Sequence, residues 1–169
     1  MKTDFILDAA QAIQRTILAN EHTLESLDRE IGDGDHYINM KRGASTVVDM
    51  QAELVTLSPE AALNKIGLKL LSTIGGASGP LLASFFMRMS KTLKEHGDDS
   101  LPKIAAAFAA GVQAIIQRGK ANLGEKTMLD VLIPVATQFE SLAALGHDAK
   151  LIASALTKTA ETGMLSTQD

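Results

Sequence analysis

The sequence predicts an all-α fold, an antiparallel up-and-down helical barrel or bundle. Aromatic residues make up only 4% of the chain, Ala and Leu are abundant, and runs of β-branched residues are missing, a composition that favours helix over strand. Apolar residues recur every three to four positions in segment after segment. The connecting loops are short, and we find neither an internal repeat nor a long linker. We therefore expect residues 1–169 to form a single domain of packed helices.

Seven long helices are expected. The first spans about 3–19, the second follows an acidic loop and ends near residue 53, and the third begins at Pro59 with Ser58 as its N-cap. Residues 23–27 add a short helical turn. The predicted core faces of these three helices are formed by Phe5, Ala9, Ile13, Ile17, Met40, Ala44, Val47, Val48, Leu63, Ile66, Leu70 and Ile74.

Four more helices follow. The first three of them are expected to end at glycines, which readily adopt the left-handed backbone conformation of a helix C-terminus. These glycines are Gly97, Gly119 and Gly146. Pro134 should kink its helix rather than end it, because the apolar spacing continues beyond it. Asp148 can cap the last helix, which is expected to fade at Gly163. The predicted core faces include Leu81, Phe85, Met89, Leu93, Ile104, Phe108, Val112, Ile115, Met128, Leu132, Val135, Phe139, Leu142, Leu151, Ile152, Ala155, Leu156 and Ala160.

The bulk composition argues against several classes of protein. The formal net charge is −4 and Lys and Arg form no cluster, whereas binding of duplex nucleic acid requires a basic face. The absence of cysteine excludes thiolate metal sites, disulfides and cysteine nucleophiles. No apolar run approaches the ~18 residues needed to cross a bilayer, and Asp4 lies where a signal peptide is apolar. We expect a cytoplasmic protein that binds neither nucleic acid nor membrane.

An acidic segment is the first candidate site. Asp28, Asp33 and Asp35 lie close together in sequence, and two intervening glycines let the chain turn tightly enough to aim their carboxylates at one point. Such hard oxygen ligands suit Mg²⁺ or Ca²⁺. The calcium-binding helix-loop-helix pattern fails, because it requires Asp or Asn where this chain has Tyr37. A metal–nucleotide site is one interpretation, and a solvated turn with an aspartate N-cap is the other.

A glycine-rich segment, 75–80, is the second candidate. It precedes a helix, so its small residues can let backbone N–H groups approach a phosphate at the positive end of the helix dipole, and Ser78 can add a hydroxyl donor. The alternative is an ordinary turn between two helices. The patterns of P-loop and dinucleotide-binding proteins are both absent.

The segment 118–130 is a third loop leading into a helix. Its cations can lie near phosphate and Met128 can cover a base, although Lys and Arg are mostly surface residues and Met is mostly a core residue. His36 adjoins Asp35, where a histidine is as suited to capping or orienting as to catalysis.

Together these segments resemble the ADP-binding subunit of the bacterial dihydroxyacetone kinase that is driven by the phosphotransferase system. The resemblance runs through almost the whole chain. It rests on Leu27-Asp28-Arg29-Glu30-Ile31-Gly32-Asp33-Gly34-Asp35-His36, Asn39-Met40, Gly75-Gly76-Ala77-Ser78-Gly79-Pro80, Arg118-Gly119-Lys120 and Lys126-Thr127-Met128. It implies a barrel of eight antiparallel helices that binds ADP or ATP at one end through two Mg²⁺ ions.

The resemblance also implies which residues form the site. Asp28, Asp33 and Asp35 match the metal ligands of the family. The positions that match nucleotide contacts are His36, Tyr37, Ile38, Asn39, Ala77, Ser78, Gly119 and Met128. No residue matches a catalytic nucleophile or general base, because phosphoryl transfer needs positioning and charge neutralisation more than covalent chemistry from the protein.

The implied function is a phosphoryl relay in a phosphoenolpyruvate-dependent kinase. A phosphocarrier subunit rephosphorylates bound ADP, and the ATP formed phosphorylates dihydroxyacetone held by a separate substrate-binding subunit. A transcription regulator and a second copy of the chain are further partners to test. Two alternatives stay open: the nucleotide domain of an ATP-dependent dihydroxyacetone or sugar kinase, and a non-catalytic module that senses nucleotide state.

The sequence departs from the family pattern in two places. Tyr37-Ile38 replaces a pair that usually begins with glycine, which puts a bulky ring beside the expected nucleotide position. The chain also ends at Asp169, before the Arg-containing segment, the Asp-Pro-Gly loop and the eighth helix of the family. We therefore expect the domain 1–169 to lack its C-terminal loop and last helix, and to leave an apolar seam open.

Overall fold

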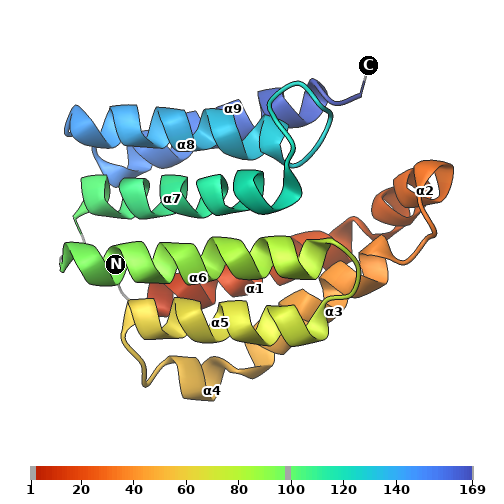
Figure 1. The fold of residues 1–169 in the computed structure, drawn as a ribbon, viewed down its shortest axis with the longest axis horizontal. Helices are drawn as coiled ribbons and strands as arrows, with labels where there is room; N and C mark the ends of the chain where they lie inside the picture. Colours follow the sequence, from red (N-terminus) through yellow and green to blue (C-terminus); the bar gives the residue numbers. More distant parts are fainter. Residues whose placement is uncertain (1–2, 98–99, 169) are drawn as a thin grey trace. The chain divides into compact units, whose positions relative to one another are not determined.

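The all-α prediction is confirmed. A computed structural model of the chain describes residues 3–97 and 100–168, and no strand occurs in these ranges (Figure 1). The helices are α1 (Thr3–Ala19), α2 (Glu21–Ile31), α3 (His36–Asp49), α4 (Gln51–Leu54), α5 (Pro59–Thr73), α6 (Ser78–His96), α7 (Leu101–Gly119), α8 (Leu129–Ala144) and α9 (Ala149–Leu165).

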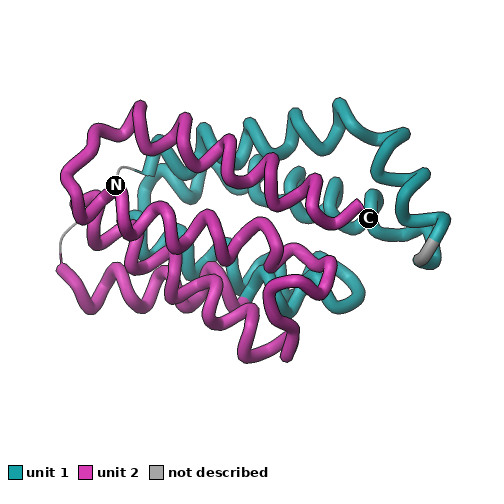
Figure 2. The backbone as a smooth tube through the Cα atoms, turned by 90° about the horizontal axis from the view of Figure 1, so that it is seen from above, with its two compact units in different colours: residues 1–83 teal, residues 84–169 magenta. Residues whose placement is uncertain are grey.

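The backbone divides into two compact units, residues 1–83 and residues 84–169, which are coloured separately in Figure 2. Unit 1 contains α1 to α5 and the beginning of α6, and unit 2 contains the rest of α6 with α7, α8 and α9. The helix α6 therefore belongs to both units. The expectation of one domain over residues 1–169 stays a prediction.

The helix α3 is the centre of unit 1, where it packs against α1, α2 and α5. The predicted core positions Val47 on α3 and Leu63, Ile66 and Leu70 on α5 are buried. Because the acidic loop leads directly into α3, the packing of this helix also fixes one side of the candidate site.

The predicted core face of α1 is wrong in part, since Ala9 and Ile17 are half-buried but the other two predicted positions are not. Phe5 and Ile13 are exposed, whereas Leu7 is buried. Apolar residues occur around more than half of this helix, so their spacing alone does not select the face that packs. Polar contacts help to orient it, since the Thr3 hydroxyl donates to the carbonyl of Leu57 at 2.9 Å.

Several expected boundaries in unit 1 are also corrected. The helix α2 has 11 residues, rather than a short turn at 23–27. The helix α3 begins at His36, directly after the acidic loop, and the chain continues beyond Met50 as the short α4. Ser58 precedes α5 as predicted, but its hydroxyl donates to the Glu60 carboxylate at 2.6 Å and makes no capping bond to a backbone N–H. The Ser58 hydroxyl thus donates to a charged carboxylate instead of accepting from a backbone N–H of the helix.

In unit 2, α8 packs against both α7 and α9. The ring of Phe108 contacts Phe85 and Phe139 edge to face, with centroid distances of 5.3 Å and 6.2 Å. Asp148 caps α9 as predicted, because its Oδ1 accepts a hydrogen bond from the N–H of Leu151 at 2.9 Å.

Pro134 and Gly163 are linked by the packing of α8 on α9. The helix α8 continues past Pro134 as predicted, and the missing N–H of proline deprives the Asp130 carbonyl of its helical donor. A Cβ added at Gly163 would lie closer than 3.0 Å to that carbonyl oxygen. The expected end of the last helix at Gly163 is therefore wrong: α9 continues to Leu165, and Gly163 permits a close approach of two backbones.

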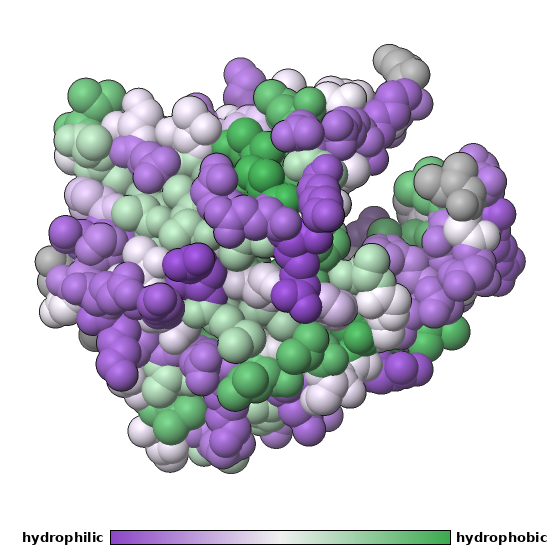
Figure 3. Space-filling view, in the orientation of Figure 1, coloured by the Kyte–Doolittle hydropathy of each residue, from purple (hydrophilic) through white to green (hydrophobic). Residues whose placement is uncertain are grey.

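The surface carries large apolar side chains in both units. Phe5 is 65% exposed in unit 1 and Leu145 is 70% exposed in unit 2. On the face drawn in Figure 3, apolar residues in green lie among polar residues in purple. In the part of the chain that the structure describes, no helix is long and apolar enough to span a membrane.

Candidate metal and nucleotide site

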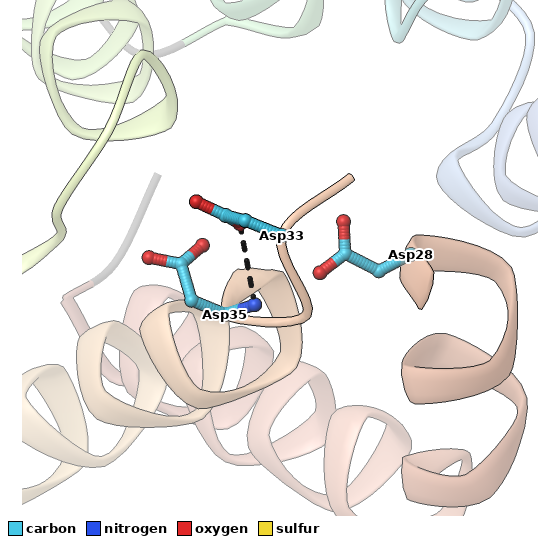
Figure 4. Close-up of side chains that lie close together, drawn as sticks. All are labelled: Asp28, Asp33 and Asp35. Atoms are coloured by element: carbon cyan, nitrogen blue, oxygen red, sulfur yellow. Dashed lines mark hydrogen bonds between the residues drawn. The ribbon is translucent and has the colours of Figure 1, made fainter. Parts of the chain in front are cut away.

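Three aspartates converge where α2 meets α3. Asp28 lies on the last turn of α2, Asp33 lies in the connecting loop, and Asp35 is the residue immediately before α3. One ligand oxygen from each lies within 4.8 Å of the others (Figure 4). Asp33 and Asp35 are exposed and Asp28 is half-buried. The proximity that the sequence predicts is therefore present, with access from solvent.

Each carboxylate has one oxygen fixed by a hydrogen bond. An Oδ atom of Asp28 accepts from the His36 N–H at 3.0 Å, and Asp33 accepts from the Asp35 N–H at 3.4 Å. Asp35 accepts from the side-chain amide of Asn39 at 2.8 Å. The second carboxylate oxygen of each aspartate accepts no hydrogen bond from the residues that the structure describes. The side chain of Asp35 makes no capping bond, and Asp28 instead supplies the acceptor for the start of α3.

Asn39 connects the acidic cluster to the glycine-rich loop. This residue is 7% exposed. It donates to Asp35 at 2.8 Å and its Oδ1 accepts from the Gly75 N–H at 3.3 Å. This one amide therefore brings two of the predicted segments together within unit 1, although they are separated by 36 residues in sequence.

The glycine-rich loop leads directly into α6. Residues 75–77 lie between α5 and α6 and are exposed, while Ser78 is the first residue of α6 and is half-buried. Gly76 has a φ of +63° and open space around it. Ala77 and Ser78, two of the predicted nucleotide contacts, thus lie at the N-terminus of a 19-residue helix, where the helix dipole favours an anion.

The predicted contacts at the start of α3 differ in exposure. His36 and Ile38 are exposed, whereas the Tyr37 side chain is only 2% exposed. The Tyr37 ring packs inside unit 1, with the Lys41 ammonium 5.4 Å from its centroid. Almost none of Tyr37, backbone or side chain, is exposed.

The loop between α7 and α8 belongs to unit 2. Gly119 is the last residue of α7, and Met128 directly precedes α8 and is 37% exposed. Lys120 and Lys126 both have left-handed backbones, with φ of 55° and 54°, a conformation that non-glycine residues rarely adopt. These predicted positions thus lie in an exposed loop with an unusual backbone.

Asp130, to which the sequence alone assigned no role, organises this loop. This residue is 5% exposed, and its carboxylate accepts from the N–H groups of Gly124 at 2.6 Å and Thr127 at 2.8 Å. These two hydrogen bonds, of which the one from Thr127 has the larger effect, hold the pKa of Asp130 below its ordinary value. The Thr127 hydroxyl accepts from the Leu129 N–H at 3.1 Å. A signal was present, because Thr-x-x-Asp before an apolar run is close to the capping-box pattern.

Comparison with known proteins shows which families the chain resembles. Residues 30–169 match the DAK2 domain. The chain is 43% identical over 112 residues to the ADP-binding subunit DhaL of the PEP-dependent dihydroxyacetone kinase of Escherichia coli, covering 66% of this chain and 53% of that subunit. Against the ADP-binding subunit DhaL of the PTS-dependent kinase of Lactococcus lactis, identity is 43% over 115 residues, with 68% and 57% covered. The chain thus spans about half the length of these relatives.

Longer proteins match as well. Triokinase/FMN cyclase of Rattus norvegicus is 33% identical over 158 residues, which cover 93% of this chain and 27% of that protein. The crystal structure of the dihydroxyacetone kinase from C. freundii in complex with AMP-PNP and Mg²⁺ superposes with a TM-score of 0.79 at 25% identity, covering 97% of this chain and 29% of that one. The chain therefore belongs to the DAK2 domain family.

Proposed function

We propose that this chain is the nucleotide-binding phosphoryl-relay subunit of a dihydroxyacetone kinase. The observation that carries the proposal is the Asn39 side chain, which joins the acidic cluster to the Gly75 loop. A cation and a phosphate chain need these two elements side by side. The bacterial relatives are named as ADP-binding subunits, which supports a nucleotide as the ligand.

The acidic cluster fits Mg²⁺. Its three carboxylate oxygens within 4.8 Å are hard ligands, and Mg²⁺ usually takes few protein carboxylates and completes its shell with waters and phosphate oxygens. Asp28, Asp33 and Asp35 would hold the metal, as two ions if the family resemblance extends to their number. When bound, Mg²⁺ neutralises the charge that phosphoryl transfer develops on the phosphate oxygens.

Backbone groups would bind the phosphates. The helices α3 and α6 both begin beside the acidic cluster, and the first N–H groups of a helix have no acceptor within it. At α3 this is the N–H group of Ile38, since Tyr37 is only 2% exposed, and at α6 Ser78 adds its hydroxyl. Further proposed contacts with the nucleotide are His36, Asn39, Ala77, Gly119 and Met128.

The chain would position the reactants rather than react with them. In this proposal ADP is rephosphorylated by a phosphocarrier subunit and then passes phosphate to dihydroxyacetone on a partner subunit. No side chain of this chain is assigned as a nucleophile or general base. The names PEP-dependent and PTS-dependent of the bacterial relatives support a phosphocarrier as the donor.

Calorimetric titration with ADP, with and without Mg²⁺, tests the nucleotide site. We expect Mg²⁺-dependent binding in the wild-type chain and a loss of at least about tenfold in affinity for Asp33→Ala and Asp35→Ala, because each variant removes a carboxylate ligand and every ~1.4 kcal/mol of binding free energy lost is a factor of ten. Asp8→Ala, an exposed aspartate of α1 outside the cluster, is the matched control and should bind normally. Unchanged affinity in both cluster variants would refute the proposed site.

An ATP-dependent kinase is the second candidate function. It is favoured by the match to triokinase/FMN cyclase, which covers 93% of this chain. Reconstitution with a dihydroxyacetone-binding subunit separates the two. Product formed from phosphoenolpyruvate only when the phosphocarrier is present supports the relay, whereas repeated turnover with ATP alone supports the second candidate.

A further inference from the structure

Asp28 lies on α2, a weakly packed helix. Among the residues of α2 whose burial the structure describes, none is buried. The main packing partner of α2 within unit 1 is α3. The position of the Asp28 carboxylate therefore depends on local contacts at the end of α2, since a hydrophobic face does not anchor the helix firmly.

Two of these contacts hold the carboxylate. Its Oδ2 accepts from the His36 N–H at 3.0 Å, across the loop from α2. Its Oδ1 lies directly over Gly32, so that a Cβ added there would overlap this oxygen. The added Cβ would also lie 3.0 Å from the carboxyl carbon and 2.9 Å from the Asp28 carbonyl oxygen. The carboxylate thus occupies the space that a side chain at residue 32 would need.

The requirement at Gly32 is for space rather than for an unusual backbone. Its φ of −122° and ψ of −165° are extended values that any residue adopts. Gly34, two residues later, is the opposite case. Its φ is +81°, and the nearest atom to an added Cβ is the Arg29 Cγ at 3.8 Å. Alanine would strain the backbone at Gly34 but would displace the Asp28 carboxylate at Gly32.

We propose that Gly32 is a positioning residue for cation binding, which acts through Asp28. The missing side chain lets the Asp28 carboxylate fold back over the loop, where Oδ2 accepts from the start of α3 and Oδ1 lies over Gly32. This inference rests on the proposed metal site. A methyl group at residue 32 pushes the carboxylate away and leaves Asp33 and Asp35 as the remaining ligands.

The proposal has one readout with metal and one without. Mn²⁺ alone is titrated into the 169-residue chain and the free ion is measured by EPR. We expect Gly32→Ala to weaken Mn²⁺ binding about 10- to 100-fold, the usual cost of losing a group that orients a ligand. In metal-free protein, NMR hydrogen exchange at His36 should accelerate in Gly32→Ala as much as in Asp28→Ala, because both variants remove the acceptor.

A double-mutant cycle separates positioning from general damage. If Gly32 acts through Asp28, most of the effect of alanine at residue 32 on both readouts disappears once Asp28 is also alanine, and only the part caused by the Asp28 carbonyl oxygen, 2.9 Å from the added Cβ, persists. Gly34→Ala is the matched control, and its effect should persist in the Asp28→Ala background. Equal effects of Gly32→Ala in both backgrounds, or wild-type Mn²⁺ affinity and His36 protection in the single variant, would overturn the proposal.

Failure to fold is also informative. If Gly32→Ala is unfolded by circular dichroism but the double variant with Asp28→Ala folds, the collision with the carboxylate is the cause and the proposal stands. If both are unfolded, the backbone itself needs glycine and the proposal falls. If the wild-type chain binds no Mn²⁺, the metal site fails, while the exchange of the His36 amide still decides whether Gly32 positions Asp28.

Discussion

Tyr37 contributes a buried ring to unit 1 and carries an unpaired hydroxyl. The side chain is 2% exposed, and no described group forms a hydrogen bond of normal geometry with the hydroxyl. Burial of the hydroxyl raises the pKa of Tyr37, the nearby Glu21 carboxylate acts in the same direction, and Lys41 acts against it. A buried polar group without a partner lowers stability, so the ring rather than the hydroxyl contributes to folding.

The change Tyr37→Phe removes only the hydroxyl. We expect the thermal unfolding midpoint to rise by about 2–4 °C, the shift that ~1 kcal/mol produces in a chain of this size. Tyr37→Leu is the control and should lower the midpoint, because it also removes ring volume from the core. A clear drop in the midpoint of Tyr37→Phe, measured by circular dichroism, would mean that the hydroxyl is hydrogen-bonded in solution.

At the scale of the element, the start of α8 depends on Asp130. Its carboxylate accepts two backbone N–H groups and its pKa is lowered by them. A depressed folded-state pKa stabilises the fold above the ordinary value of 3.8, and this contribution is lost as the pH falls through the depressed value.

Asp130→Asn is therefore expected to be less stable than the wild-type chain at neutral pH, since an amide cannot accept from both N–H groups with the strength of a carboxylate. The difference should narrow as the pH falls below 3.8. Denaturant unfolding at a series of pH values measures it. If the difference in unfolding free energy between the two proteins stays constant to pH values well below 3.8, the charge of Asp130 contributes nothing to stability.

The pairing of α8 with α9 depends on Gly163. A Cβ there would lie closer than 3.0 Å to the Asp130 carbonyl oxygen, so the two backbones must separate to accept alanine. We expect Gly163→Ala to destabilise unit 2 by about 1–3 kcal/mol, as overpacking does, despite the better helix propensity of alanine. Ala153→Gly, on the exposed side of α9, is the control and should cost about 1 kcal/mol through propensity alone. A stabilised Gly163→Ala variant would contradict the close packing.

Across the whole molecule, the sequence predicted the helix content and most helix ends, because proline and glycine start or stop a helix through the backbone conformation of their own positions. It did not predict the orientation of α1, since Phe5 and Leu7 are equally apolar and only tertiary contacts choose between them. The convergence of Asp33 and Asp35 followed from short-range spacing. The Asn39 link to Gly75 spans 36 residues, and no local pattern reports such a contact.

Ligand binding should stabilise the whole chain by mass action. At a free concentration of 100 times Kd, a ligand that binds only the folded state adds about 2.7 kcal/mol, which corresponds to roughly 5–11 °C in the unfolding midpoint of a chain of this size. We expect this shift with Mg²⁺ and ADP together and its reversal by EDTA. Thermal melts with ADP alone, Mg²⁺ alone and both provide the comparison. An equal shift with ADP alone would argue against a metal-dependent site.

The convergence of three aspartates has a consequence for the stability of the unliganded protein. Like charges with ligand atoms within 4.8 Å of one another repel, and no described cationic side chain forms an ion pair with them. If the proposed metal site is correct, this loop lowers the folding stability of the unliganded chain in exchange for ligand binding. Substitutions that neutralise one of these aspartates are expected to be tolerated or even favoured by selection for thermostability alone, and only selection for ligand binding would retain the full set.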